Sequence, residues 1–335
     1  MLAAVVAGPE RLEVATVPPP EPADRAVVAM ERMGLCGTDA SILAGKIPVS
    51  YPRVLGHELI GRVVRSGLRG QPAEGTRVLV DPSLACGRCR QCRADLSHLC
   101  PHGALLGRDV DGGCTEMVAV DEAQLLVLPD DYPAEAAALL QVLGTCVHAQ
   151  THLSGALPGR NAAVIGLGVS GLLLLQLLRA AGLRVMGVTR SQWKRELAER
   201  LGAEGVVPPQ EAASAIAAFT GGEGVDIVVE AVGTVDTWAQ AIELAGAGAE
   251  VLLFGTIGGS PNARLPLYQL YYKELTIRNP RAARHRDYER AIALATEGMV
   301  KLAPLWTHGY RLEQAAEAFT ALRSDPRALK VTLEV

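Results

Sequence analysis

The stretch Val164-Ile-Gly-Leu-Gly-Val-Ser-Gly171 decides the fold of this 335-residue chain. A short apolar run, Ala162–Ile165, precedes its glycines, and a long apolar run, Val169–Ala181, follows them. The spacing Gly-x-Gly-x-x-Gly between a strand and a helix is typical of a turn that holds a dinucleotide pyrophosphate at the helix N-terminus. A glycine-rich turn that binds nothing is the alternative. The residues predicted to contact a dinucleotide here are Gly166, Gly168, Val169, Ser170 and Gly171.

Strands and helices alternate beyond this turn. Such alternation indicates an α/β fold with a doubly wound parallel sheet and helices on both of its faces. The expected strands are Leu183–Val188, Val225–Glu230 and Glu250–Phe254, and the expected helices are Gln192–Leu201 and Thr237–Ala245.

The opening third of the chain has a different pattern, in which Gly and Pro separate short apolar runs. This pattern predicts a β-rich region. Because single cores stop growing at roughly 250–300 residues, we expect two domains. The strands expected in the opening third are Ala26–Met30, Leu59–Val64 and Arg77–Val80; near the end we expect helices Tyr288–Glu297 and Leu312–Leu322 and a strand Ala328–Val335.

The end of the second strand of the dinucleotide fold bears on the choice of coenzyme. An NAD site usually has an acidic residue there that binds the ribose hydroxyls. This chain has Thr189 at that position, followed by Arg190. A guanidinium group attracts a 2′-phosphate, whereas a carboxylate repels it. We therefore expect NADP(H) in preference to NAD(H), with a solvated loop arginine as the alternative interpretation of Arg190.

Four of the seven cysteines lie within fifteen residues, at Cys86, Cys89, Cys92 and Cys100. Four thiolates at such close spacing suit a closed tetrahedral zinc site. An iron–sulfur cluster is the main alternative, because Cys-x2-Cys-x2-Cys also begins ferredoxin motifs. The longer fourth gap favours structural zinc over that cluster, and reduced thiols without metal are the remaining interpretation.

Two further short segments, Gly34-Leu-Cys-Gly-Thr-Asp39 and Gly56-His-Glu58, acquire a meaning together with the cysteine loop and the glycine turn. In this order, the four motifs resemble those of the zinc-containing medium-chain alcohol dehydrogenase superfamily, in its sorbitol and sugar dehydrogenase-like branch. The resemblance covers essentially the whole chain. It implies a GroES-like β-rich catalytic domain at residues 1–143 and 280–335 and a Rossmann dinucleotide-binding domain at residues 144–279.

The resemblance also implies two zinc ions per chain, one catalytic and one structural. Cys36 and His57 would be ligands of the catalytic zinc, and Glu58 would be a ligand or an exchangeable neighbour. Gln141 stands where relatives carry a glutamate ligand. A neutral amide donates less charge, so the zinc would be a stronger Lewis acid. Cys146 is a competing ligand, and we expect it to lie inside a helix.

Three other positions correspond to functional residues of the relatives. Thr38 would bond the substrate oxygen and begin a proton relay. Ser41 stands where the relay often continues through histidine. Lys330 corresponds to a basic residue near the pyrophosphate, although an exposed lysine on a terminal strand would account for it equally well.

Composition excludes several classes of function. The net charge is −4 without a basic block, so no nucleic-acid footprint is present. The longest apolar stretch, Ala162–Leu178, is interrupted by three glycines, and Met1–Val17 holds no long apolar core. We expect a cytoplasmic protein without membrane contact, acting on a small molecule as a homodimer or homotetramer.

The expected function is hydride transfer between a nicotinamide coenzyme and a secondary alcohol or ketone. Only 4% of residues are aromatic. This disfavours an aromatic-lined pocket. Gln141 and Glu58 favour a sugar, polyol or cyclitol, including aminocyclitols, over a simple secondary alcohol. A zinc-free reductase of enones or quinones typically lacks the Cys-His-Glu set. A non-catalytic NADPH-binding protein is the alternative from another class.

Overall fold

The computed structural model describes residues 1–21, 24–154, 158–256 and 265–335. The chain forms two compact units. The first comprises Met1–Gly144, Arg284–Thr296 and Leu302–Val335, and the second comprises Thr145–Ala283 and Glu297–Lys301. The division after Gly144 falls within helix α4 (Leu140–Gln150).

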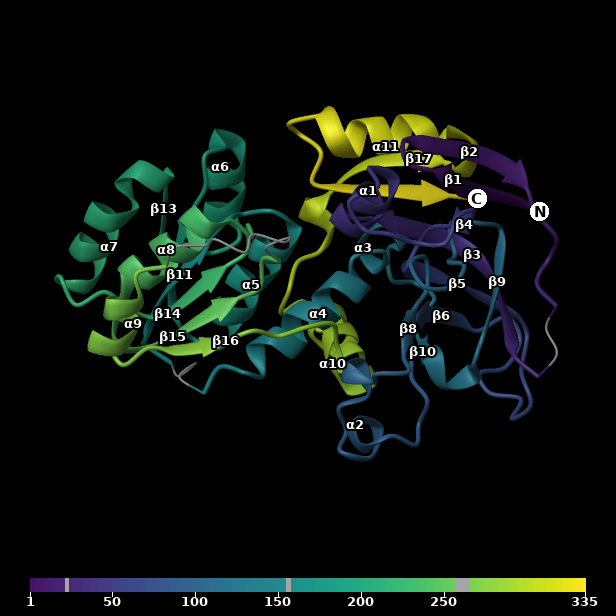
Figure 1. The fold of residues 1–335 in the computed structure, drawn as a ribbon, viewed down its shortest axis with the longest axis horizontal. Coiled ribbons are helices and arrows are strands. Elements are labelled where there is room, and N and C mark those ends of the chain that lie inside the picture. Colours follow the sequence, from purple (N-terminus) through teal and green to yellow (C-terminus); the bar gives the residue numbers. More distant parts are fainter. Residues whose placement is uncertain (22–23, 155–157, 257–264) are drawn as a thin grey trace. The chain divides into compact units, whose positions relative to one another are not determined.

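The second unit contains a six-stranded sheet with the order β13-β12-β11-β14-β15-β16. Every neighbouring pair in it is parallel. Figure 1 shows α5 on one side of these strands and α7 and α8 on the other, as expected of a doubly wound sheet. The elements are β11 Asn161–Ile165, α5 Val169–Ala180, β12 Arg184–Val188, α6 Gln192–Arg200, β13 Gly205–Val207, α7 Ala212–Thr220, β14 Val225–Glu230, α8 Val235–Leu244, β15 Ala245–Leu253, α9 Leu267–Tyr272 and β16 Thr276–Arg278.

The expected elements of this unit are present, and one boundary differs from its expected position by more than two residues. Strand β15 begins at Ala245, five residues before the expected Glu250, and α8 ends at Leu244. Two small side chains, Ala245 and Ala249, are buried in the sheet core there. Small residues carry little hydrophobic signal, which explains why apolar periodicity placed the strand too late.

The first unit is built from β-sheets. Its main sheet has seven strands, in the order β10-β6-β5-β3-β18-β17, with β9 also paired to β3. Smaller sheets are formed by β2-β1-β4 and by β7-β8. The strands are β1 Leu2–Gly8, β2 Arg11–Thr16, β3 Ala26–Leu35, β4 Arg53–Val54, β5 Glu58–Arg65, β6 Arg77–Val80, β7 Ser83–Leu84, β8 Ala104–Leu105, β9 Met117–Val120, β10 Leu125–Val127, β17 Trp306–Arg311 and β18 Lys330–Glu334.

Strand β3 is the centre of this sheet, because β5, β9 and β18 all pair with it in antiparallel register. Strand β18 comes from the end of the chain, so the C-terminal segment completes a sheet begun near the N-terminus (Figure 1). Besides the part of α4 before Thr145, the helices of the unit are α1 Gly37–Leu43, α2 Arg90–Arg93, α3 Ala134–Ala137, α10 His285–Thr296 and α11 Ala315–Ser324.

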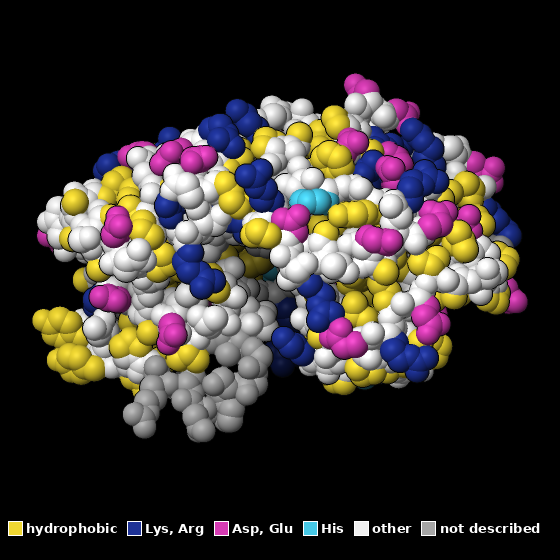
Figure 2. Space-filling view, turned by 90° about the horizontal axis from the view of Figure 1, so that it is seen from above, with side chains coloured by type: hydrophobic (Ala, Val, Ile, Leu, Met, Phe, Trp, Pro, Cys, Tyr) yellow, Lys and Arg dark blue, Asp and Glu magenta, His cyan; other side chains and the backbone are white. Residues whose placement is uncertain are grey.

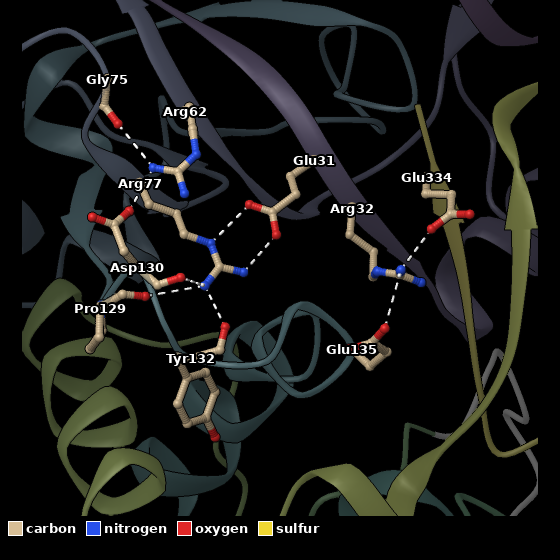
Figure 3. A network of polar contacts seen from close by, with 10 residues as sticks. All are labelled: Glu31, Arg32, Arg62, Gly75, Arg77, Pro129, Asp130, Tyr132, Glu135 and Glu334. Carbon is tan, nitrogen blue, oxygen red and sulfur yellow. Dashed lines mark hydrogen bonds and ion pairs between the residues drawn. The ribbon is translucent and has the colours of Figure 1, made fainter.

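A buried arginine joins this sheet to the segment that leads into α3. Arg77 on β6 is 3% exposed and donates two hydrogen bonds to Glu31, with N–O distances of 2.8 and 2.6 Å. It also donates to the backbone oxygens of Pro129, Asp130 and Tyr132 (Figure 3). Paired, hydrogen-bonded charges are the form in which a buried arginine is tolerated. The network fixes the chain's path towards α3 and α4.

The surface agrees with the small net charge of the sequence. Figure 2 shows Lys and Arg side chains interspersed with Asp and Glu over the face in view. Among the described residues, no helix combines the length and the apolar character required to cross a membrane.

Candidate active site and metal sites

Cys36 lies at the junction of β3 and α1. It is the N-cap residue of α1, with extended backbone (φ −135°), and its Sγ accepts the backbone N–H of Thr38 at 3.2 Å. The carboxylate of Asp39 accepts the backbone N–H of Cys36 at 3.0 Å, which completes a capping box. The strand end and the helix start therefore fix the position of the sulfur.

His57 reaches the same point from the start of β5. Gly56 precedes it with φ +102°, a left-handed conformation that favours glycine. The Nε2 atom of His57 lies 3.1 Å from Sγ of Cys36. Its Nδ1 atom faces Oδ1 of Asp39 at 3.5 Å, and both of these buried atoms lack a closer hydrogen-bond partner among the described residues. A carboxylate behind the distal nitrogen is the usual support of a metal-binding histidine.

Glu58 completes the cluster. One ligand atom each from Cys36, His57 and Glu58 lie within 4.8 Å of one another. The Glu58 side chain is also bound by Lys330, whose Nζ donates to Oε2 of Glu58 and, at 3.2 Å, to the backbone oxygen of Leu35. The side chains of Glu58 and Lys330 are each 2% exposed. The ion pair leaves the second oxygen of Glu58 as the atom available to a cation.

The structure contradicts one of the two expectations for Lys330, namely that it is an exposed lysine on the terminal strand. The side chain is buried, so the interpretation as an exposed lysine on a terminal strand is wrong. Burial is sustained by the ion pair with Glu58, two strands away in the same sheet. Contact of Lys330 with a dinucleotide stays a prediction.

The electrostatics of the cluster favour a cation beside Nε2 of His57. Burial lowers the pKa of His57, but the charges of Cys36 and Asp39 outweigh it and raise the pKa well above the usual value. Burial likewise raises the pKa of Asp39, yet the interaction with His57 lowers it overall. The same negative charges stabilise any cation placed at this point, a metal ion included. The donor set of thiolate, imidazole and carboxylate suits zinc.

Gln141, the other expected ligand, lies at the start of α4 and is 7% exposed. Its Nε2 donates to the hydroxyl of Tyr288 on α10 at 3.3 Å. Burial, followed by the charge of Asp81, raises the pKa of Tyr288 well above its usual value, and Glu58 adds to this effect. The sequence did not indicate Tyr288, since it lies 147 residues after Gln141.

Thr38 and Ser41 both lie on α1 and are half-buried. The contact between the backbone N–H of Thr38 and Sγ of Cys36 places Thr38 beside the cluster. Cys146 lies inside α4, as expected, where its Sγ donates to the backbone oxygen of Ser170 at 3.7 Å. Burial raises the pKa of Cys146 strongly, which disfavours the thiolate form that a ligand needs.

The four cysteines of the second cluster converge as the sequence predicts. All four sulfurs lie within 4.8 Å of one another, and the described contacts are 3.4 Å (Cys89–Cys92), 3.8 Å (Cys89–Cys100) and 4.0 Å (Cys86–Cys92). Four sulfurs at about 2.3 Å from a tetrahedral zinc would lie roughly 3.8 Å apart. The backbone N–H groups of Arg88 and Cys89 lower the pKa of Cys86 to about 6, whereas burial and the neighbouring thiols raise the pKa of Cys92 to about 12, as expected where four thiols crowd together without a cation. The cluster therefore fits a zinc ion.

The glycine turn has the geometry that a dinucleotide site requires. Gly166 has φ +89°, and Gly168 is the N-cap of α5. A Cβ on Gly171 would lie 1.8 Å from the backbone oxygen of Gly166, so only glycine permits this close packing. At Gly168, by contrast, no described atom lies within 4 Å of the corresponding Cβ position. The first and third glycines shape the turn, and the second leaves open space at the helix N-terminus, where Val169 and Ser170 begin the helix.

Thr189 and Arg190 follow β12 at the same sheet edge, and Arg190 is exposed. A second arginine, which the sequence interpretation missed, lies beside them. Nη1 of Arg195 on α6 donates to the backbone oxygens of Thr189 and Arg190 at 3.3 Å each. The sequence signal that could have identified Arg195 is its position within the first turn and a half of α6, the helix that follows β12. The structure therefore offers two guanidinium groups at the end of β12.

A pocket of about 480 Å³ lies within the second unit at the carboxyl end of β15. Ligands of open α/β sheets usually bind at this end of the strands. A cationic side chain, that of Arg281, is among its lining residues. The lining is Thr145, Trp238, Leu253, Phe254, Gly255, Thr256, Asn279, Pro280, Arg281 and Ala282.

Two family models match the chain. One, described as an alcohol dehydrogenase GroES-like domain, matches residues 22–130. The other, described as a zinc-binding dehydrogenase, matches residues 170–297. The first match covers both predicted metal clusters except Gln141, and the second begins within the glycine turn.

Individual relatives match almost the whole chain. The L-threonine 3-dehydrogenase of Symbiobacterium thermophilum is 30% identical over 331 residues, which cover 95% of this chain and 93% of the relative. The L-galactonate-5-dehydrogenase of Escherichia coli (strain K12) is 30% identical over 305 residues, covering 90% and 88%. A solved structure from Sinorhizobium meliloti 1021, described as a zinc-binding dehydrogenase bound to NADP, is 32% identical and has a TM-score of 0.91, covering 100% and 99%.

These matches agree with the order of motifs in the sequence and with the two folded units. They cover the predicted metal-ligand residues and the glycine turn in one continuous comparison. The chain belongs to the zinc-containing medium-chain alcohol dehydrogenase superfamily, combines a GroES-like domain with a Rossmann-like domain, and is an oxidoreductase of the alcohol dehydrogenase type.

Proposed function

We propose that this protein transfers a hydride between NADP(H) and a secondary alcohol or ketone of the sugar, polyol or aminocyclitol class. The observation that carries the proposal is the cluster of Cys36, His57 and Glu58, whose ligand atoms lie within 4.8 Å of one another. A half-buried cysteine sulfur with a buried imidazole and a buried carboxylate offers the donor types of a zinc site.

The proposed catalytic metal site uses Cys36 and His57 as ligands, with Gln141 contributing its amide oxygen. Glu58 is a ligand or an exchangeable neighbour, with Oε2 held by Lys330. Zinc, when bound there, supplies a Lewis acid for the substrate oxygen, and the nicotinamide ring supplies or accepts the hydride. A second zinc bound by the four-cysteine loop would have a structural role.

The residues of the chain move the proton and shape the site. Thr38 Oγ1 would take the hydroxyl proton of the alcohol and release its own proton to the next group in the relay. The backbone N–H of Thr38 bonds Sγ of Cys36, which places the residue beside the cluster. Ser41, one helical turn further along α1, is the next hydroxyl on a path towards water. Asp39 holds Cys36 and His57 in place through their backbone and ring nitrogens.

The coenzyme is proposed to bind to the glycine turn, with its 2′-phosphate at Arg190. Thr189 lacks the charge that would repel this phosphate, and Arg195 adds a second guanidinium group at the same edge. The NADP-bound relative supports this preference. NAD(H) is the alternative coenzyme.

The substrate class is inferred from polarity and from the relatives. L-Threonine 3-dehydrogenase and L-galactonate-5-dehydrogenase are named for oxidation of secondary hydroxyl groups in polar molecules. A chain with 4% aromatic residues agrees with a polar substrate. A simple secondary alcohol is the second candidate, and it would leave the polar groups of such a site unpaired.

The proposed assembly is a homodimer or homotetramer paired through β16. This strand is at one edge of the six-stranded sheet, and Ile277 on it is 38% exposed. Exposed strand edges invite pairing. Helix α9, which precedes β16, carries four side chains that are 67–83% exposed: Leu267, Tyr268, Tyr271 and Tyr272. Figure 2 shows hydrophobic side chains gathered at the left edge, the end at which α9 lies in Figure 1.

The function is tested by following absorbance at 340 nm with NAD or NADP against a panel of polyols, sugar acids, aminocyclitols and simple secondary alcohols. The matched variant is Cys36→Ser, which removes the thiolate ligand. We expect this variant to lose alcohol oxidation and to bind the reduced coenzyme as the unaltered protein does. Full activity of Cys36→Ser would refute the metal assignment, and reduction of NAD alone would refute the coenzyme preference.

A further inference from the structure

The hydrogen bond between Gln141 and Tyr288 connects two buried side chains from different parts of the first unit. Gln141 is 7% exposed and Tyr288 is 1% exposed. Nε2 of Gln141 donates to the Tyr288 hydroxyl at 3.3 Å. In a buried setting, an amide nitrogen without such a partner would cost about 1–3 kcal/mol. With the phenol as the acceptor, the contact holds the amide nitrogen of Gln141 towards Tyr288.

Gly144 fixes the tyrosine ring against α4. It lies three residues after Gln141 and so on the same face of the helix. A Cβ at Gly144 would lie 2.1 Å from Cδ1 and 2.5 Å from Cε1 of Tyr288. The absent side chain lets the ring pack directly on the helix backbone, next to Gln141. The Tyr288 hydroxyl is consequently held by ring packing and not only by its hydrogen bond.

The direction of the amide decides whether Gln141 can bind a metal. The amide oxygen has lone pairs for a cation, whereas the amide nitrogen has two hydrogens and no available lone pair. A phenol that accepts a hydrogen bond from the nitrogen engages the end of the amide that cannot ligate. The oxygen is then the end left free for the cation.

We propose that Tyr288 is a positioning residue that orients the Gln141 amide with its oxygen towards the catalytic metal. The inference rests on the proposed function, in which Gln141 is a ligand. A glutamate at position 141 would not need such orientation, because either of its oxygens can ligate. The neutral ligand in this chain thus requires a partner that a carboxylate would not.

The test uses the full-length protein loaded with cobalt(II) or zinc. The variants are Tyr288→Phe, Gln141→Glu, the double variant and Gln141→Ala. Tyr132→Phe is the control, since it removes a tyrosine hydroxyl whose pKa is raised by burial alone. Metal affinity is measured by competition with a chromophoric chelator, and the ligand set is followed by the visible spectrum of the cobalt protein. The four-cysteine site serves as an internal reference.

We expect Tyr288→Phe to weaken metal binding at the Cys36 site by about 10- to 100-fold, the usual effect of losing a residue that orients a ligand. The cobalt spectrum should change only for this site. In the Gln141→Glu background the same substitution should change the affinity by less than about threefold, within the range of one ordinary hydrogen bond. An equal loss in both backgrounds would show a merely structural role and overturn the proposal.

The outcomes also separate this inference from the proposed function. If Gln141→Ala alters the cobalt spectrum but Tyr288→Phe does not, the orienting role fails and the metal site stands. If the unaltered protein binds metal only at the four cysteines, the proposed function and the inference that rests on it both fail. A spectrum unaffected by Gln141→Ala, with metal still bound, would remove Gln141 as a ligand and overturn the orienting role.

Discussion

The buried ion pair of Glu58 and Lys330 leads to a quantitative prediction for Lys330→Met. Methionine retains an unbranched side chain of similar length but removes the charge. In this variant the carboxylate of the Glu58 side chain, which is 2% exposed, would face no cation at Oε2. Removing one partner of a buried pair costs about 3–5 kcal/mol, because the remaining charge is uncompensated. We therefore expect the first unit to be strongly destabilised.

The expected change in melting temperature follows from the size of that unit. For domains of 150–250 residues, each kcal/mol lowers Tm by about 2–4 °C, so the loss should be about 6–20 °C. Calorimetry on the metal-free protein would measure it, because a cation bound at the Cys36 site would itself compensate the charge of Glu58. Lys46→Met is the control, because Lys46 is an exposed lysine of the same unit and its loss should change stability by less than about 0.5 kcal/mol.

A second substitution distinguishes electrostatics from packing. Glu58→Gln in the Lys330→Met background removes the uncompensated charge, so most of the lost stability should return. A Tm for Lys330→Met close to that of Lys46→Met would contradict the reasoning. So would a double variant as unstable as Lys330→Met, since the loss would then come from packing and not from a buried charge.

Three further predictions concern the coenzyme, the structural metal and pH. Arg190→Ala should weaken NADPH binding by about 10- to 150-fold, which corresponds to the loss of a charged hydrogen bond of about 1.5–3 kcal/mol. NADH binding should not change, and calorimetric titrations would measure both affinities. Equal effects on the two coenzymes would refute the 2′-phosphate contact. Cys92→Ser should reduce bound zinc by one ion per chain in elemental analysis, while two retained ions would contradict the four-cysteine site. The interaction with Asp81, whose Oδ2 lies 3.6 Å from Nδ1 of His285, raises the pKa of His285 above 6.5. The protonated His285 therefore stabilises the folded protein fully at pH values below its pKa in the unfolded state, and this stabilisation is lost as pH rises through its pKa in the folded state. His285→Gln should consequently lower Tm at acidic pH only. An equal loss of Tm at all pH values would refute this assignment.

Local sequence patterns predicted those features of the molecule that are themselves local. The four cysteines lie within fifteen residues, and a single loop brings their sulfurs together. The glycine turn similarly depends on Gly166 and Gly171, which are five residues apart and in direct contact. Spacing determines geometry over such short distances, because the chain has few ways to close the loop. The parallel sheet followed from the same kind of short-range alternation.

The contacts that spacing did not predict join residues far apart in the sequence. Gln141 and Tyr288 are separated by 147 residues, and Glu58 and Lys330 by 272. Their pairing depends on β18 and α10 joining the first unit, a property of the tertiary fold. A lysine on a terminal strand is ordinarily exposed, so its burial had no sequence signal apart from the family resemblance. Arg195 lies close in sequence to Thr189 and Arg190, yet the sequence analysis did not single it out, because it is one of several charged residues on an amphipathic helix.

Gly34 links the backbone of the sheet to the chemistry of the site. It lies on β3, between Glu58 on β5 and the segment of β18 that begins with Lys330. A Cβ at Gly34 would lie 2.1 Å from Oε2 of Glu58 and 2.9 Å from Cε of Lys330. The ion pair therefore crosses β3 through the space that a side chain would fill. Since Gly34 is two residues from Cys36, the same stretch of strand delivers the thiolate and admits the lysine that holds the neighbouring carboxylate. The missing side chain at Gly34 is therefore a requirement of the proposed metal site, alongside its predicted ligands.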